Sequence, residues 1–235
     1  MKRVSSDGMD VFRPKGQLGK EIELASRAPG EVIRILSDKL SDERRLRIDD
    51  VVSRRTRHLT VAIEGVRDPH NTAAVIRTAD AFGLQVVHVI ERGDRFLSSR
   101  KVTQGAHKWV DLGVWERAEL FAKVVRDEGK KILIATMDGA LPLEDLDPTE
   151  PMALVFGNEH DGVSPEMREI SDGAFFIPMF GFTESINVSA AAAITLAALR
   201  KGGDGSLTPK EAEILRARFY LRAVRAGYDI VMLEK

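Results

Sequence analysis

The sequence predicts an α/β protein built around a mostly parallel sheet with helices on both faces. From residue 59 onward, short apolar runs typical of buried strands alternate with segments of helical periodicity. Runs such as LTVAIE and AFFIPM are apolar at nearly every position, as in strands that are covered on both faces. A chain of 235 residues with 43% hydrophobic residues is also long enough to bury such a core.

The first 58 residues are predicted as an extension outside that sheet. Residues 1–30 mix Lys, Ser, Gly and Pro without sustained periodicity, which predicts a flexible or loosely packed arm. Residues 31–40 and 41–58 have the pattern of two helices, and Ser41 is a suitable N-cap for the second. The second helix is rich in arginine, which is typical either of a solvated helix face or of a surface that contacts phosphate.

Residues 59–201 are predicted as the sheet domain itself, with most strands joined by a helix and therefore parallel. The predicted strands are 59–64, 85–91, 130–137, 152–159 and 174–179, and the predicted helices are 71–83, 116–129, 164–173 and 188–201. A glycine-rich stretch ends the domain. Residues 202–235 form a tail with one more helix, which begins at Thr208 and ends at Gly227.

Composition narrows the class of protein. The chain has 35 basic and 36 acidic residues, so binding to nucleic acid would depend on local basic patches rather than on an overall positive field. It has no cysteine, which removes thiolate metal sites and disulfides and suits a reducing cytoplasm. No apolar run reaches membrane-spanning length, and the first residues lack the apolar core of a signal peptide. We therefore expect a soluble, cytoplasmic protein with no membrane partner and no metal.

The sequence also lacks the motifs of several large enzyme classes. No strand is followed by G-x-G-x-x-G, and there is no Walker lysine loop, no H-E-x-x-H and no nucleophile elbow. A protein that reads dinucleotides or nucleoside triphosphates is therefore disfavoured.

The first stretch that could carry chemistry leaves a strand and enters the helix at 71–83. Asn71 fits the N-cap of this helix. Arg77 has alanines at its neighbouring helical positions, so its guanidinium is open to a planar anion such as phosphate. A structural ion pair with Asp68 or Asp80 is the alternative for this arginine.

Two further stretches follow later strands. Gly157 comes directly after an apolar strand and permits a sharp turn or the close approach of a ligand, at a place where open α/β sheets bind ligands. Ser185 and Asn187 place a hydroxyl and an amide at the entry of the alanine-rich helix, although an N-cap needs only one of them. The alanines after Ser189 predict a helix that packs closely against the sheet or a second subunit.

Basic residues gather in three places. The segment 91–110 combines basic residues with Phe96 and Trp109, a mixture that suits phosphate contact and base stacking in RNA. The last predicted helix carries arginines at positions i, i+4 and i+7, which would form a basic stripe. The candidate RNA-binding residues are Arg54, Arg55, Arg100, Lys101, His107, Lys108, Arg218, Arg222 and Arg225. A place in the core for Trp109, and in a turn for His107, is the alternative.

In this order, the stretches NTAAVIRTADAFG, VFGNEHDGVS and IPMFGFTESINVSAAAA resemble the three motifs of the SpoU (TrmH-like) family of SPOUT RNA 2′-O-methyltransferases. The resemblance covers residues 59–200, and GAHKWV is similar to a segment of the members that act on tRNA. It implies a C-terminal deep trefoil knot, an exception to the rule against knots, and a homodimer that holds S-adenosylmethionine in the knot. It also implies methylation of a ribose 2′-hydroxyl in tRNA, with guanosine 18 of the D-loop as the expected nucleotide.

The same resemblance implies roles for individual residues. The implied catalytic residues are Arg77, Asn71, Ser185, Asn187 and Glu159, and the implied cofactor-binding residues are Thr136, Met137, Gly157, Ile177, Met179, Ile186 and Ser189. Because arginine stays protonated in proteins, Arg77 is a weak candidate for a free base. We expect it to grip a phosphate beside the ribose and to stabilise the developing oxyanion, while that phosphate or a water takes the proton. An arginine that acts as a phosphate-activated base is the competing version, and Glu184 receives no role.

Three other functions stay open. Methylation of ribosomal RNA is the alternative within the family, but the first 58 residues are too short and too charged for the separate RNA-binding domain of many such relatives. A catalytically inactive RNA-binding or assembly protein is the alternative from another class. A flavodoxin-like domain for a small ligand would have no RNA affinity and no steep salt dependence.

Overall fold

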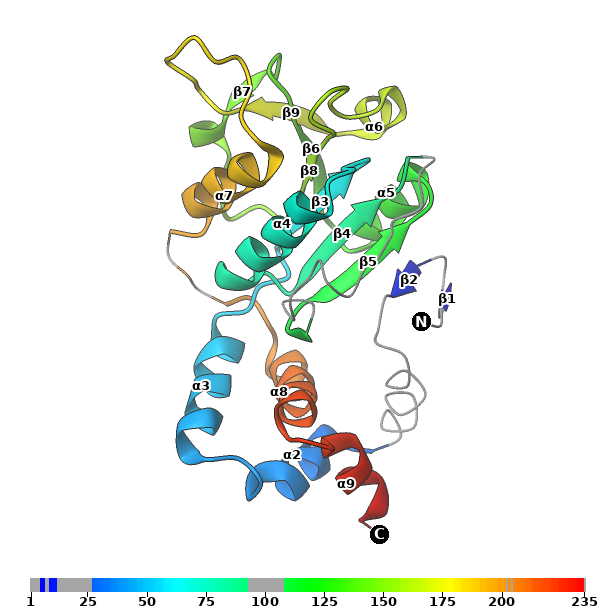
Figure 1. The fold of residues 1–235 in the computed structure, drawn as a ribbon, viewed down its shortest axis with the longest axis vertical. Coiled ribbons are helices and arrows are strands. Elements are labelled where there is room, and N and C mark those ends of the chain that lie inside the picture. Colours follow the sequence, from blue (N-terminus) through cyan, green and yellow to red (C-terminus); the bar gives the residue numbers. More distant parts are fainter. Residues whose placement is uncertain are drawn as a thin grey trace. The chain divides into compact units, whose positions relative to one another are not determined.

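The computed structural model describes residues 5–6, 9–11, 27–92, 108–201, 203 and 205–234 (Figure 1). The chain divides into two compact units. One unit contains the sheet and comprises residues 4–11 and 57–203, and the other is helical and comprises residues 1–3, 12–56 and 204–235.

The sheet unit is an α/β body with a mostly parallel sheet, which confirms the predicted fold class. The strand order is β1-β2-β5-β4-β3-β8-β6-β9-β7, and all neighbours from β5 to β7 are parallel. The strands are β1 (Ser5–Ser6), β2 (Met9–Val11), β3 (Leu59–Glu64), β4 (Val86–Ile90), β5 (Asp111–Trp115), β6 (Lys131–Ala135), β7 (Leu141–Pro142), β8 (Met152–Phe156) and β9 (Gly173–Phe176). The knot implied by the family resemblance stays a prediction.

Helices cover both faces of this sheet. They are α4 (Pro69–Ala81), α5 (Ala118–Asp127), α6 (Pro165–Ile170) and α7 (Val188–Leu199), with a 3-10 turn η2 (Leu143–Asp145). α5 and α6 pack together on one face, where Phe121 and Met167 meet strand residues such as Ala153 and Val155. α4 and α7 pack against each other on the other face (Figure 1). Cover on both sides explains why β3 and β8 are buried at every position.

The structure contains strands that the sequence pattern does not predict. β5 lies in DLGVW, where Asp111 and Gly113 interrupt the apolar run. Gly113 is required by packing, because a Cβ at this position would lie 2.9 Å from Nδ1 of His88 on the neighbouring strand β4. β1 and β2 lie in the segment predicted as a loosely packed arm, and they extend the sheet antiparallel beside β5. The prediction is therefore wrong for residues 5–6 and 9–11, where pairing with the sheet supplies an order that composition does not reveal.

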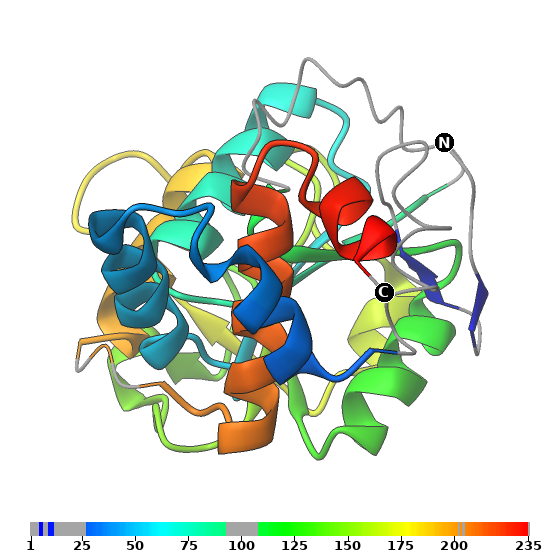
Figure 2. The same ribbon diagram turned by 90° about the horizontal axis from the view of Figure 1, so that it is seen from below.

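Among the described residues, the helical unit contains α2 (Pro29–Ser37), α3 (Asp42–Ser53), α8 (Pro209–Ala223) and α9 (Gly227–Leu233). α8 packs against α2, α3 and α9, and Figure 2 shows α2 beside α8. Ser41 caps α3 through Arg44 N, and Thr208 forms a capping box with Glu211, so both predicted helix starts are confirmed. Among the helices of the described residues, none combines the length and the apolarity needed to cross a membrane.

The last helix ends earlier than predicted. α8 stops at Ala223, because the chain reverses at Ala226, which has a left-handed φ of 58°, and enters α9. Arg225 is therefore not on the same helix as Arg218 and Arg222. The predicted basic stripe of three arginines on one helix is wrong.

Arg55 also has a different environment from the one predicted. Its side chain is only 1% exposed, and its guanidinium carbon lies 5.6 Å from the centroid of the Phe219 ring. A guanidinium in this position contributes to the core of the helical unit and cannot reach a phosphate at the surface. The prediction that Arg55 binds RNA is therefore wrong.

A buried polar pair lies in the core of the sheet unit. Trp115 Nε1 donates a hydrogen bond to His88 Nδ1 at 3.0 Å, and both side chains contact Phe121. His88 is 2% exposed, and its Nε2 atom has no hydrogen-bond partner within the described residues. Burial, and to a lesser extent the charge of Lys130, lowers the pKa of His88 to about 3. The imidazole is therefore neutral in the folded protein at physiological pH.

We expect this histidine to make the folded state sensitive to acid. Because folding lowers the His88 pKa from 6.5 to about 3, the unfolded chain binds one more proton in that interval. The contribution of His88 to the free energy of unfolding should be complete above pH 6.5 and fall by up to about 1.4 kcal/mol per pH unit below it. Urea unfolding at several pH values measures this slope. His88→Asn retains an acceptor for Trp115 and should show a shallower slope, and an equal slope in both proteins would contradict the assignment.

Candidate active site

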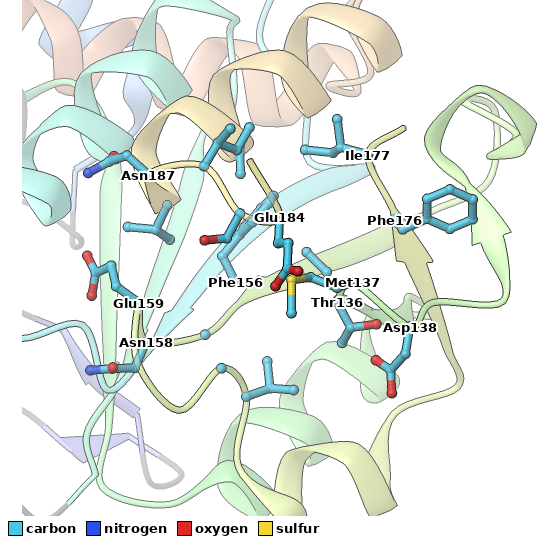
Figure 3. Close-up of a pocket in the computed structure, with 18 of the residues that line it drawn as sticks. Thr136, Met137, Asp138, Phe156, Asn158, Glu159, Phe176, Ile177, Glu184 and Asn187 are labelled. Carbon is cyan, nitrogen blue, oxygen red and sulfur yellow. The ribbon is translucent and has the colours of Figure 1, made fainter. Parts of the chain in front are cut away.

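A cavity of about 1190 Å³ opens at the carboxyl ends of β6, β8 and β9 (Figure 3). The carboxyl ends of parallel strands meet at one edge of a sheet, which is where open α/β sheets bind ligands. The walls come from residues 135–138 after β6, from 156–163 after β8, and from the segment 175–188 between β9 and α7. The second and third of these segments contain two of the motifs that the sequence singles out.

Gly157 lets the chain turn sharply as it leaves β8. A Cβ at this position would overlap the backbone of Gly162 and Val163, which folds back over the glycine. Asn158 holds the resulting loop, because its Nδ2 donates to Gly65 O at 2.7 Å and its Oδ1 accepts from His160 N at 2.7 Å. Of the two predicted reasons for Gly157, the structure supports the sharp turn.

A buried carboxylate fixes the far end of the same loop. Glu64 is 1% exposed at the end of β3, and it accepts hydrogen bonds from the amide of Ser164 at 2.7 Å and from its hydroxyl at 2.6 Å. Ser164 also caps α6 by accepting from Met167 N, as its place before Pro165 predicts. The loop between β8 and α6 is therefore held at both ends.

Four residues form a continuous chain of hydrogen bonds beside the cavity. Asn71 Nδ2 donates to Glu159 Oε1, and Asn187 Nδ2 donates to Asn71 Oδ1 at 3.0 Å. Asn187 Oδ1 in turn accepts from the amide of Ser189 at 2.8 Å and from its hydroxyl at 2.6 Å. We call Asn71, Glu159, Asn187 and Ser189 the asparagine network. It joins one residue or more from each of the three sequence motifs.

One of the two asparagines caps a helix and the other, contrary to the prediction, does not. Asp68 caps α4 by accepting from His70 N at 2.8 Å, so Asn71 lies inside the first turn and its side chain is available to the network. Asn187 is the N-cap of α7, whereas Ser185 lines the cavity without a hydrogen bond among the described residues. The prediction of Asn71 as a cap is wrong, because an aspartate two positions before His70 takes that place.

Arg77 lies on α4, outside the cavity wall. Its side chain is exposed. In the described part of the chain it forms no ion pair with Asp68 or Asp80, which were its expected structural partners. Its guanidinium is therefore available to a ligand, and the two catalytic roles considered for it stay predictions.

The residues predicted to bind a cofactor fall into two groups. Those that line the cavity are Thr136, Met137, Gly157, Ile177, Met179 and Ile186. Ser189 does not line it, because its amide and hydroxyl bond to Asn187. The role of the lining residues toward a cofactor stays a prediction.

The candidate RNA-binding residues are scattered. Arg54 is exposed and pairs with Asp50 at 3.0 Å, and the Lys108 ammonium lies 4.9 Å from the centroid of the Trp109 ring. Arg218 and Arg222 are half-buried on α8, and Arg225 is exposed beyond its end. Arg100, Lys101 and His107 lie outside the described residues.

Several residues of the site escape sequence reasoning. Glu64 has a detectable signal, because a carboxylate at the end of an otherwise apolar strand must find donors if it is buried. Asp138 and Arg168 line the cavity from the loop after β6 and from α6, and nothing in the local pattern marks them, whereas Asp161 lies in the motif VFGNEHDGVS but has no predicted role. Among the residues that the structure describes, no group of three or more His, Asp or Glu side chains is placed to bind a metal ion.

Comparison with known proteins places this geometry in a family. Residues 58–197 match the model of the SpoU rRNA Methylase family. A tRNA (guanosine(18)-2′-O)-methyltransferase of Borreliella burgdorferi is 34% identical over 199 residues, which are 82% of this chain and 91% of that protein. The protein of the same name from Thermus thermophilus is 36% identical over 157 residues, 66% of this chain and 81% of its own length.

Solved structures agree with this assignment. The A. aeolicus TrmH/SpoU tRNA modifying enzyme superposes with a TM-score of 0.69 at 30% identity and covers 78% of this chain and 98% of its own. The SpoU methyltransferase AviRb from Streptomyces viridochromogenes, solved in complex with AdoMet, has a TM-score of 0.56 at 25% identity, over 63% of this chain and 58% of its own. The resemblance based on the three motifs is therefore confirmed.

We expect Gly157→Ala to destabilise the protein, because the new methyl group would overlap backbone rather than a movable side chain. The loss should be about 3 kcal/mol in the free energy of unfolding, measured by urea denaturation. Gly181→Ala is the matched control, because Gly181 also lines the cavity but a Cβ there meets its nearest atom at 4.0 Å. Equal stability of the two variants would show that the turn tolerates a side chain.

Proposed function

The chain belongs to the SpoU rRNA methylase family, and we propose that it transfers a methyl group from S-adenosylmethionine to the 2′-hydroxyl of guanosine 18 in tRNA. The observation that carries this proposal is the asparagine network, which joins the three motifs beside one cavity. The names of the relatives from Borreliella and Thermus support the choice of nucleotide.

The cavity suits S-adenosylmethionine. Met137, Ile177, Met179 and Ile186 offer an apolar wall for the adenine ring and the methylene chain. Carboxylates and amides at the edge of the cavity offer acceptors and donors for the ribose and the amino-acid portion. S-adenosylmethionine has no phosphate, which agrees with the lack of a phosphate-binding glycine loop in the sequence. When bound, it supplies an electrophilic methyl group on a positively charged sulfur.

Arg77 is the residue that would position the substrate. A ribose hydroxyl is a weak nucleophile, so the site must align its oxygen and remove its proton. The exposed guanidinium can grip the neighbouring phosphate through two parallel hydrogen bonds and can stabilise the negative charge that develops on the oxygen. The substrate phosphate or a water then accepts the proton, because the guanidinium itself stays protonated.

The asparagine network would hold α4, the helix that bears Arg77, in a fixed position relative to the cavity. Asn71 lies on α4, as does Arg77, and its amide is fixed by Glu159 on one side and Asn187 on the other. A fixed α4 keeps the guanidinium in a constant place relative to the loops that line the cavity. Ser185, whose hydroxyl has no partner among the described residues, is available to the substrate ribose.

A homodimer is part of the proposal. α7 is apolar on all sides, and a helix of this kind is normally covered all round. One side of α7 is buried in its own chain, whereas Ala190, Ile194 and Ala197 form an exposed apolar stripe at i, i+4 and i+7. The stripe of a second copy would cover it. We further infer a cytoplasmic location and a knotted path of the segment from β8 to α7, in line with the family.

Methylation assays with tRNA transcripts test the proposed nucleotide. Purified protein, S-adenosylmethionine with a labelled methyl group and tRNA should give one 2′-O-methyl group at guanosine 18. A transcript with deoxyguanosine at position 18 lacks the hydroxyl and should not react. Methylation of ribosomal RNA alone would overturn the choice of substrate, and RNA binding without any methyl transfer would indicate an inactive RNA-binding protein.

Arg77→Lys tests the role of the guanidinium. A lysine keeps the positive charge but cannot form two parallel hydrogen bonds, so we expect the single-turnover rate to fall by about 100-fold with a smaller loss of RNA affinity. Arg117→Lys, at an exposed position before α5, is the matched control and should leave the rate unchanged. A near-normal single-turnover rate in Arg77→Lys would contradict the proposal that Arg77 grips the phosphate through two hydrogen bonds.

A further inference from the structure

Glu184 is a carboxylate in the cavity wall for which neither the motifs nor the asparagine network provides a use. It lies on the segment that connects β9 to α7, between Thr183 and Ser185. Figure 3 shows its side chain in the middle of the cavity, between Asn187 and Glu159 on one side and Thr136 and Asp138 on the other. Within the described residues it forms no hydrogen bond and no ion pair.

Among the described residues, the cavity wall has an excess of negative charge. Four carboxylates line it, at Asp138, Glu159, Asp161 and Glu184, against one arginine, Arg168. That arginine pairs with Asp138 at 3.4 Å, and Glu159 accepts a hydrogen bond from Asn71. Asp161 lies on the turn that follows β8. Asp161 and Glu184 are therefore the two wall carboxylates without a partner among the described residues, and Glu184 is the one that lies on the segment between β9 and α7.

Glu184 is exposed to solvent, so its attraction for a cation is that of a single charge at the edge of an open cavity. Methyl transfer changes the charge of the proposed cofactor. S-adenosylmethionine has a positively charged sulfonium. Once the methyl group has been transferred to the ribose oxygen, the sulfur of the product S-adenosylhomocysteine is a neutral thioether. A fixed negative charge can distinguish these two molecules, which share every other group.

We propose that Glu184 makes the cavity prefer the cationic cofactor over its neutral product. The inference rests on the proposed function, because it assumes that S-adenosylmethionine binds in this cavity. As a consequence, the cavity retains S-adenosylmethionine while its sulfur is charged. S-adenosylhomocysteine lacks that charge and is held less tightly. Glu184 acts here as a specificity-determining residue and takes no part in moving the proton.

Calorimetric titration of the full chain tests this preference. The ligands are S-adenosylmethionine, S-adenosylhomocysteine and sinefungin, an analogue with an ammonium group in place of the sulfonium. Glu184→Gln keeps the size of the side chain and removes its charge. We expect it to weaken the two cationic ligands about tenfold, the size of one charge contact at the edge of a site, and to leave S-adenosylhomocysteine unchanged. Asp161→Asn, a change of charge elsewhere on the wall, is the matched control and should change the affinity ratio less.

The outcomes separate the inference from the function. Equal weakening of all three ligands by Glu184→Gln, or no change in any of them, would overturn the role of Glu184 while leaving the methyltransferase intact. A lower single-turnover rate at saturating S-adenosylmethionine with an unchanged affinity ratio would also overturn it, since the carboxylate would then act on the proton. Failure of the unaltered protein to bind S-adenosylmethionine would instead remove the proposed function.

Discussion

The hydrogen bond between the side chains of Asn71 and Asn187 is the contact on which the site depends. It connects α4 to the start of α7 through the side-chain oxygen of Asn71. The side-chain nitrogen of Asn71 donates to Glu159 and so connects both helices to the loop after β8. An amide has distinct donor and acceptor ends, so each bond in the series determines the orientation of the next. Three segments that are far apart in sequence therefore take one relative arrangement beside the cavity.

The sequence predicts the sheet well because burial on both faces leaves a local signal in each strand. β3 and β8 are buried at every position and mostly apolar, so pattern analysis can detect them. It does not detect β5, because the reason for Gly113 is a side chain on the neighbouring strand. A local sequence pattern contains no information on which strand will lie beside Gly113.

The site divides in the same way. Family motifs identify Asn71, Glu159 and Asn187, but their mutual contacts join residues that are 88 and 116 positions apart. Asn71 illustrates the limit of local reasoning: it has the right type for a helix cap, yet Asp68 begins the helix and frees the amide for a distant partner. Arg55 is a second example: it is buried, whereas its neighbour Arg54 is exposed, although both lie in the same polar stretch of sequence.

Asn187 performs two tasks with one side chain, because its oxygen begins α7 and its nitrogen reaches across to α4. Aspartate would begin the helix equally well but has no N–H to donate, and an alanine would do neither. Few other residues at this position would therefore preserve both the stability of the helix and the geometry of the site. Evolutionary change here would require compensating replacements in two other segments, so the three motifs are free to diverge only as a set.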